Sequence, residues 1–216
     1  MKKLFLLVLV ATIATGVNAQ SPKYISAMKP LVAAIDSSFN YDQLLATANS
    51  FQRIADAEKT QWLPYYYAAY STVAAAYTLT TGGSGDAAKT DPLADKAETL
   101  LNQAEALSKD NSEIWCVRKQ IASLRLLADP MNRYMTYGPK ATEALEKAKQ
   151  LNPENPRVYL LEAQDKFYTP EQFGGSKTEA KSLLEKSASK FETWKPESEI
   201  HPRWGRNQIS YFMTQF

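Results

Sequence analysis

One segment of this chain is repeated 44 residues further along. Apolar positions of the first copy return at the same offset in the second: Ala97, Leu101, Ala104, Leu107 and Trp115 are followed by Ala141, Leu145, Ala148, Leu151 and Tyr159. A weaker third copy lies 39 residues beyond the second, at Ala180, Leu184 and Ser187. Repetition at such a period is typical of chains built from stacked supersecondary units. These units bury their apolar faces on one another and usually present a surface to a partner rather than house a reaction.

Nearly every segment has the periodicity of a helix. Between residues 41 and 59, apolar residues recur at spacings of three, four and seven, and Asn40 precedes them as a helix cap. Asp91-Pro92 and Asn155-Pro156 predict two further helix starts, because an Asp or Asn side chain accepts unpaired amide hydrogens and proline at the first position loses none. No stretch alternates with period two, so we predict an all-α fold of about eight or nine helices with no sheet.

The C-terminal part continues in the same way. Ser176 and Glu179 form a capping box that predicts another helix start. In the tail, Trp204, Tyr211 and Phe212 fall at helical spacing. They predict a terminal helix that caps the exposed end of the stack.

The spacing of small and large residues resembles the second helix of the tetratricopeptide repeat, a helix–turn–helix unit. Ala141, Leu145, Ala148 and Pro153 match that pattern at all four positions. The other two copies lack the proline, and the first-helix pattern is kept only in part, at Trp115 and Tyr159. The resemblance covers about residues 41–195. It implies an αα-hairpin solenoid of about three helix pairs plus capping helices.

The first nineteen residues have the pattern of a secretory signal peptide. Lys2 and Lys3 precede an apolar run, and small residues end at Ala19, where a signal peptidase would cut. The run is shorter than the roughly 20 residues of a comfortable membrane span, so an uncleaved anchor is only the alternative. We expect a periplasmic or secreted protein with one domain over 20–216, a C-terminal cap at 196–216, and no membrane span after cleavage.

Charge and motifs exclude several classes of function. Without Lys2 and Lys3 the chain has 23 basic and 23 acidic residues, which argues against a nucleic-acid partner. His201 is the one histidine, so no second histidine completes a zinc site, and Cys116 is the one cysteine, predicted as a buried inert thiol. Catalytic motifs such as HExxH, GxSxG and CxxC are missing from the sequence. We therefore expect no enzyme activity, no metal and no cofactor.

Six aromatic residues crowd one predicted helix, from Trp62 to Tyr77. Either they are core residues with hydroxyls at the edge, or some of them line the inner groove, where the first helices of such repeats face a partner. Alignment on Trp115 and Tyr159 extends that inner face to the later helices. The predicted partner-binding set is Tyr67, Tyr70, Gln120, Leu124, Arg157, Gln164 and Tyr168. This mixture suits an extended peptide or a polar small ligand better than a nucleic acid.

Three connections are predicted to be long, over residues 81–90, 129–138 and 169–175, and to gather on one edge of the stack. The second has adaptable and aromatic side chains that either contact a partner or fold back over the gap between helices: Met131, Arg133, Tyr134, Met135 and Tyr137. In the third, Phe173-Gly174-Gly175 resembles a turn of certain bacterial repeat proteins.

These features predict a non-catalytic adaptor that holds a protein or peptide in its groove or at its long-loop edge. The alternative is a small-molecule-binding or enzymatic pocket roofed by the long loops. A third possibility is a self-associating structural module, so the sequence leaves the oligomeric state open.

Overall fold

The computed structural model describes residues 21–37, 40–80 and 85–216. Within these ranges the chain forms nine α-helices, one short 3-10 helix and no strand, which confirms the predicted all-α fold. The helices are α1 (Pro22–Ile35), α2 (Tyr41–Ala57), α3 (Trp62–Tyr77), α4 (Ala87–Leu107), α5 (Ser112–Ala128), α6 (Pro130–Leu151), α7 (Pro156–Tyr168), η1 (Glu171–Phe173), α8 (Lys177–Thr193) and α9 (Arg206–Met213). No helix in the described ranges is both long and apolar enough to cross a bilayer. The proposed signal peptide, residues 1–19, lies outside them.

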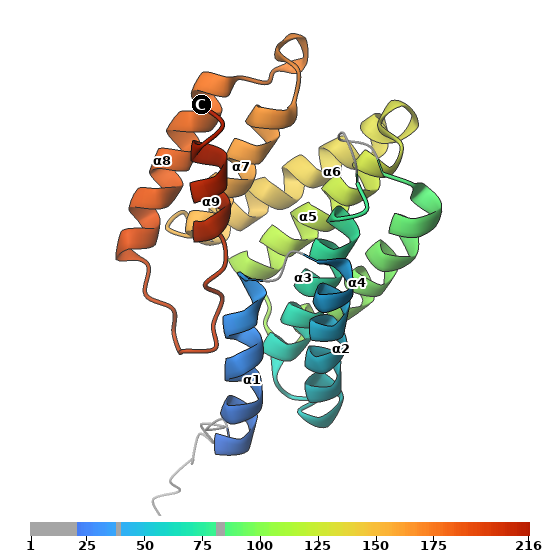
Figure 1. Ribbon diagram of the computed structural model, residues 1–216, viewed down its shortest axis with the longest axis vertical. Coiled ribbons are helices and arrows are strands. Elements are labelled where there is room, and N and C mark those ends of the chain that lie inside the picture. Colours follow the sequence, from blue (N-terminus) through green and yellow to red (C-terminus); the bar gives the residue numbers. More distant parts are fainter. Residues whose placement is uncertain (1–20, 38–39, 81–84) are drawn as a thin grey trace, which may run out of the picture.

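Consecutive helices pack as pairs along the chain (Figure 1): α3 on α4, α5 on α6, and α7 on α8. The repeated small residues make these contacts close, since Ala104 of α4 and Ala148 of α6 are completely buried. Helix α2 covers α3, and α1 packs on α2. One apolar core runs from Tyr24 in α1 to Phe212 in α9.

Asparagine caps mark the starts of α5 and α7. The Asn111 side chain accepts a hydrogen bond from the backbone N–H of Glu113 at 2.9 Å, and the Asn155 side chain accepts one from Arg157 at 3.0 Å. The predicted start at Asn155-Pro156 is therefore confirmed. The other two predicted caps, Asn40 of α2 and Ser176 of α8, are confirmed as well.

The predicted helix start at Asp91-Pro92 is wrong, because α4 already begins at Ala87. The Asp86 side chain caps it by accepting a hydrogen bond from the N–H of Ala88 at 3.0 Å. Pro92 is then the sixth residue of the helix, where its missing N–H removes one intrahelical hydrogen bond. The Asp91 carboxylate instead accepts two hydrogen bonds from the guanidinium of Arg133 on α6, at 2.7 and 2.8 Å.

The segment from Asp129 to Gly138 is not a long loop. Helix α5 ends at Ala128 and α6 begins at Pro130, so Asp129 alone connects them and caps α6. Asp-Pro is the helix-start signal here, with proline at the first position. Of the predicted loop over 81–90, residues 87–90 are helical and 81–84 lie outside the described residues. Residues 130–138 are helical as well, and the connection over 169–175 remains, so the described residues do not form the predicted roof of long loops. The exposed large apolar side chains of this segment lie on α6 and are Met131, Tyr134 and Met135.

The C-terminal tail forms a helix, as predicted, but the helix begins only at Arg206, so Trp204 lies outside it. The tail also covers more than the end of the stack. We call residues 194–213 the C-terminal strap; it consists of an irregular connection through Gly205 and helix α9. Figure 1 shows it leaving the end of α8, passing α1 and returning to lie along α8. Glu199 of the strap forms an ion pair with Lys29 of α1 at 2.7 Å. The Asn207 side chain donates a hydrogen bond to the backbone carbonyl of Asp36 at 3.0 Å.

Candidate functional site

The inner face of the array, formed by α3, α5 and α7, is the surface predicted to bind a partner. Five of its seven predicted residues are buried: Tyr67, Tyr70, Gln120, Leu124 and Arg157. Gln164 is half-buried, and only Tyr168 is well exposed, at 67%. The structure thus brings most of the predicted set to one face, but that face is closed.

The C-terminal strap is what closes it. The Trp204 indole stacks on the ring of Tyr70 with centroids 4.6 Å apart, and its N–H donates to the Tyr66 hydroxyl at 2.8 Å. The Tyr67 hydroxyl donates to the backbone carbonyl of Ile200 at 3.0 Å. In this structure the chain itself occupies the space beside these tyrosines, so their direct contact with a partner stays a prediction.

Gln164 and Gln120 are placed differently from one another. The Gln164 side chain donates to the amide oxygen of Gln208 in α9 at 3.0 Å, and Gln208 in turn donates to Tyr70 at 3.3 Å. Gln120 contributes its backbone carbonyl, which accepts a hydrogen bond from Tyr77 at 2.9 Å. Neither amide side chain is directed to a free groove.

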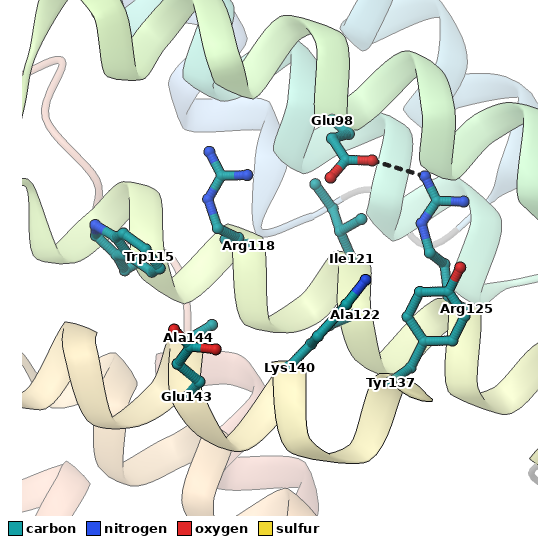
Figure 2. A pocket seen from close by; sticks show the side chains of 10 residues that line it. All are labelled: Glu98, Trp115, Arg118, Ile121, Ala122, Arg125, Tyr137, Lys140, Glu143 and Ala144. Carbon is teal, nitrogen blue, oxygen red and sulfur yellow. Dashed lines mark hydrogen bonds and ion pairs between the residues drawn. The ribbon is translucent and has the colours of Figure 1, made fainter. Parts of the chain in front are cut away.

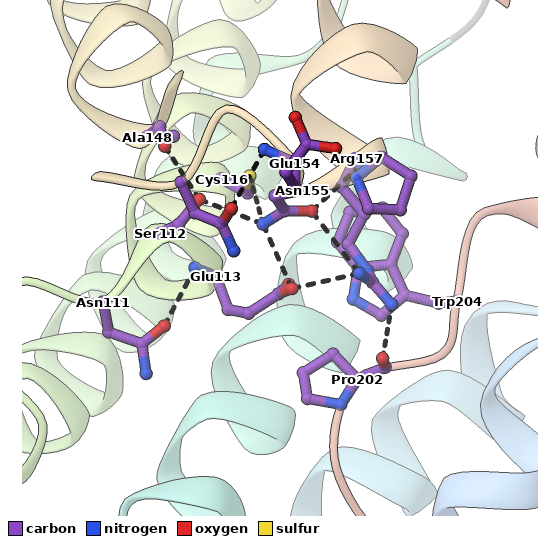
Figure 3. A network of polar contacts seen from close by, with 12 residues as sticks. Asn111, Ser112, Glu113, Cys116, Ala148, Glu154, Asn155, Arg157, Pro202 and Trp204 are labelled. Carbon is purple, nitrogen blue, oxygen red and sulfur yellow. Dashed lines mark hydrogen bonds and ion pairs between the residues drawn. The ribbon is translucent and has the colours of Figure 1, made fainter. Parts of the chain in front are cut away.

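A buried polar network anchors the strap (Figure 3). Arg157 donates to Glu113 at 3.0 Å and, through its other terminal nitrogen, to the backbone carbonyl of Pro202. The Glu113 carboxylate also accepts hydrogen bonds from Asn155 at 3.1 Å and from Tyr66 at 3.3 Å. Burial raises the pKa of Glu113, and the positive charge of Arg157 opposes that shift. The two terminal nitrogens of Arg157 thus bind Glu113 and the strap, so the network joins α5, α7 and the strap.

Arg157 is completely buried, and aromatic rings surround its guanidinium. Its central carbon lies 5.2 Å from the Trp204 ring centroid, 5.4 Å from that of Phe191 and 5.6 Å from that of Trp194. Among the described residues, the Nε of Arg157 and the indole N–H of Trp194 have no hydrogen-bond partner. The aromatic rings therefore surround the guanidinium, but they leave its Nε–H without a hydrogen-bond acceptor.

A pocket of about 490 Å³ lies on the opposite side of α5, between α4 and α6 (Figure 2). Four of the lining residues lie on one face of α5, because they are spaced three, four and three residues apart. They are Trp115, Arg118, Ala122 and Arg125. The lining consists of Glu98 from α4; Trp115, Arg118, Ile121, Ala122 and Arg125 from α5; and Tyr137, Lys140, Glu143 and Ala144 from α6.

The pocket combines an apolar floor with aromatic ends. Ile121, Ala122 and Ala144 are buried and form small apolar surfaces. Figure 2 shows Trp115 at one end of the pocket and Tyr137 at the other. Such a mixture of apolar and aromatic lining with a few polar groups is typical of small-molecule sites.

Three cations flank this floor. Arg118 lies 5.5 Å from the ring centroid of Trp115, and Lys140 lies 5.2 Å from that of Tyr137. Arg125 donates to two carboxylates of α4, to Asp95 at 2.6 Å and to Glu98 at 2.8 Å. Lys140 is exposed and forms no ion pair with the described residues. Arg118 and Arg125 are thus both paired with carboxylates of α4, since Arg118 also donates to Glu105. Lys140 is the lining cation that can offer its charge to a ligand carboxylate without breaking an ion pair of the described residues.

A second apolar feature is an aromatic surface at the end of α7 and along α9. It consists of Phe167, Tyr168, Tyr211, Phe212 and Phe216, whose rings contact one another with centroids 5.2–5.7 Å apart. Tyr168, Tyr211 and Phe216 are 67%, 60% and 44% exposed. The Nζ of Lys177 lies 3.1 Å from the Phe167 ring centroid.

The single histidine and the single cysteine are held in place by neighbouring residues. His201 contacts the Ser198 hydroxyl at 2.7 Å through Nδ1 and lies 3.2 Å from Glu197 through Nε2, and burial lowers its pKa. Cys116 is buried, 3.9 Å from the Asn155 amide nitrogen. Within the described residues, no group of three His, Cys, Asp or Glu side chains is placed to hold a metal ion.

Sequence reasoning missed the pocket between α4 and α6. Trp115 was assigned to the repeat pattern, and Arg118 and Arg125 were not singled out as a set. Their common face on α5 is visible in the spacing alone. The position of Tyr137 beside these residues could not be predicted, because its segment was expected to be a loop.

One solved structure shares both the fold and a large part of the sequence. The HusA haemophore from Porphyromonas gingivalis is 36% identical to this chain, with a TM-score of 0.77, and the alignment covers 91% of this chain and 94% of that one. No family profile matches the chain, and no curated protein sequence matches it either. The identity and the coverage together extend the likeness beyond the fold.

Proposed function

Because this chain belongs to the family of the HusA haemophore, we propose that it is an exported, non-catalytic carrier of haem or a related tetrapyrrole. The relative's name supports a binding role and the choice of ligand. The pocket between α4 and α6 is the observation that carries the proposal to particular residues.

The size and lining of the pocket fit a flat, mostly apolar ring. Its volume of about 490 Å³ lies within the range of small-molecule sites, about 300–1,000 Å³. The rings of Trp115 and Tyr137 provide flat surfaces for a macrocycle. Ala122 and Ala144 in the floor leave room for the ring to approach the backbone of α5 and α6.

The cations fit the two carboxylates on one edge of a haem ring. Arginine binds carboxylates through paired hydrogen bonds. In the structure Arg125 already binds Asp95 and Glu98 of α4, which are carboxylates of the same chemistry. A ligand carboxylate would share Arg125 with these exposed side chains, and the positive charge of Lys140 would balance the negative charge that the ligand adds.

Tyr137 is the pocket residue with a hydroxyl that can ligate iron, and the lining has no histidine, cysteine or methionine. His201 lies in the strap, on the inner face of the array, and is engaged by Ser198 and Glu197. We therefore expect the ring and its carboxylates to supply most of the affinity, so that iron-free protoporphyrin binds as well as haem.

Two finer predictions remain part of this proposal. The three successive pairs α3/α4, α5/α6 and α7/α8 and the 44-residue offset support a tetratricopeptide-like solenoid. Lys2, Lys3 and the apolar run that ends before Ala19 support export. A carrier that is exported meets its ligand outside the cytoplasm.

The test is a titration of residues 20–216 with haemin and, separately, with protoporphyrin, followed by Soret absorbance and tryptophan fluorescence. The double variant Arg118→Gln/Arg125→Gln should weaken both by at least about tenfold, since two charge-assisted contacts are lost. The matched control is Arg53→Gln on α2, where the guanidinium donates to the Ser50 hydroxyl at 2.9 Å and to no other described residue. That variant should bind like the unaltered chain.

A parallel variant addresses the aromatic surface of α7 and α9. Tyr168→Ala/Tyr211→Ala should leave binding unchanged. If it abolishes binding while the arginine variant does not, the ligand lies on the aromatic surface and the pocket assignment is wrong. If neither haemin nor protoporphyrin binds at micromolar concentration, the tetrapyrrole proposal fails.

A further inference from the structure

The strap lies on the inner face in the manner of a bound peptide. Two donors of that face, the Tyr67 hydroxyl and the Arg157 guanidinium, bind main-chain carbonyls of the strap, at Ile200 and Pro202. These carbonyls are two residues apart in a non-helical stretch. Hydrogen bonds to main-chain carbonyls recognise the backbone conformation of a segment rather than its side chains, as in other peptide-binding surfaces.

The side chain of Trp204 anchors this segment of the strap. Trp204 is 1% exposed and is held between the Tyr70 ring, at 4.6 Å, and the Arg157 guanidinium, at 5.2 Å. Its N–H donates to the Tyr66 hydroxyl at 2.8 Å. A buried tryptophan at the centre of a contact, with aromatic and arginine neighbours, has the composition of a binding hot spot. The pocket for Trp204 is therefore the specific part of this surface.

The fit of the strap is incomplete. The Nε of Arg157, completely buried beside the strap, has no hydrogen-bond partner among the described residues, and the same holds for the indole N–H of Trp194. Buried donors without acceptors cost free energy, so a segment that supplies an acceptor would bind this face better than the strap does.

Ile200, Ile209 and Phe212 of the strap are buried in the core, but other contacts of the strap are reached by solvent. Lys29 and Glu199, which pair at 2.7 Å, have side chains 63% and 45% exposed. The hydrogen bond from Asn207 to the Asp36 carbonyl is also exposed. Exposed pairs of this kind contribute little to stability, so detachment at these points is easy compared with the centre.

We propose that the inner face is a peptide-binding groove that the chain's own strap occupies in cis. Its partner is a polypeptide segment with the pattern of Ile200 to Trp204: an apolar residue, then proline two positions later and tryptophan two further on. Such a segment competes with the strap for Tyr67, Arg157 and the pocket of Trp204. This inference does not rest on the tetrapyrrole proposal, because the groove and the pocket lie on opposite faces of α5.

The test converts the strap into a separable ligand of the mature chain. A protease recognition site is inserted between Lys195 and Pro196, in the irregular connection after α8, and the folded chain 20–216 is cleaved there. A fluorescent peptide of residues 198–213 is then added, and its anisotropy is followed as it exchanges with the cleaved strap. We expect saturable binding. The Trp204→Ala peptide should bind at least about tenfold more weakly. The matched control peptide carries Arg203→Ala, because Arg203 is exposed.

Every other outcome overturns the proposal. Loss of the helical circular dichroism on cleavage would make the strap an integral part of the core rather than a ligand. A peptide that does not exchange with the strap, or a Trp204→Ala peptide that binds as tightly as its parent, would remove the groove or its specific pocket. Light scattering that shows uncleaved chains exchanging straps in a dimer would assign the groove to a second copy instead of a partner.

Discussion

Glu113 and Arg157 hold the same position in successive repeats, 44 residues apart, and they form a buried ion pair of 3.0 Å. Each is the second residue of its helix, behind an asparagine cap. The repeat thus places opposite charges at equivalent sites of α5 and α7. Because Arg157 also binds the carbonyl of Pro202, the pair joins two repeats and the strap in one network.

Replacing one partner of this pair should destabilise the protein strongly. In Glu113→Gln the buried guanidinium loses its counter-charge, so the free energy of unfolding should fall by about 3 kcal/mol or more. The control is Glu199→Gln, which breaks the exposed pair with Lys29 and should cost less than about 1 kcal/mol. Urea unfolding at neutral pH measures both. Equal losses for the two variants would contradict the assigned role of the buried pair.

Five tyrosines of α1 and α3 should resist ionisation as long as the chain stays folded. Burial raises the pKa of each, as the main cause, in α1 and α3: Tyr24, Tyr66, Tyr67, Tyr70 and Tyr77. The unfolded chain loses these protons near pH 10, whereas the folded chain keeps them, so stability should fall as the pH rises above about 10. Tyrosinate absorbance should therefore increase abruptly at alkaline unfolding. Gradual ionisation of all twelve tyrosines before unfolding would show that these hydroxyls reach solvent.

Two glycines with positive φ allow the cost of backbone strain to be measured separately from the cost of side-chain crowding. Gly205 has φ +119°, and an added Cβ would lie 3.0 Å from Cζ of Phe191 and 3.1 Å from Cδ2 of Leu160. Gly174 has φ +92° with nothing within 4 Å. Gly205→Ala should cost roughly 2 kcal/mol more than Gly174→Ala, because only the first forces side chains apart. Thermal unfolding of both variants measures the difference, and similar losses would mean that the strap shifts freely at Gly205.

The close contact between α5 and α6 should not accept a larger side chain. Ala148 is completely buried, and its carbonyl accepts a hydrogen bond from the Ser112 hydroxyl at 2.8 Å. Ala148→Trp should cost about 3 kcal/mol or more through overpacking. Ala106→Trp, at an exposed position of α4, is the control and should change stability little. An unchanged melting temperature for Ala148→Trp would contradict the alignment of the repeats.

Capping residues and prolines predicted most helix starts correctly, and they failed where two possible starts lay close together in the sequence. Asn155-Pro156 and Ser176 start helices as expected, because no neighbouring residue offers a better cap. Asp91-Pro92 has the same form, yet Asp86 caps the helix earlier and Pro92 is carried inside it. At Asp129 the reverse error occurred, since an Asp-Pro start was taken for part of a loop.

The inner face could be predicted as a set of residues but not as a closed surface. Its periodicity on α3, α5 and α7 depends on residues close in the chain. The structure does bring Tyr70 and Arg157 together at Trp204, and Tyr67 binds the same strap at Ile200. That they are covered depends on a segment far away in the sequence.

The amino-acid sequence by itself determined the helical fold, the caps and the small residues of the close helix contacts, because these follow from interactions within a few turns of the chain. Only the tertiary structure decided that the strap fills the inner face, where Trp204 bonds to Tyr66 across 138 residues, and that α4 and α6 enclose a pocket over α5. Contacts over such separations follow from the way whole faces pack together, and no local pattern of residues encodes them.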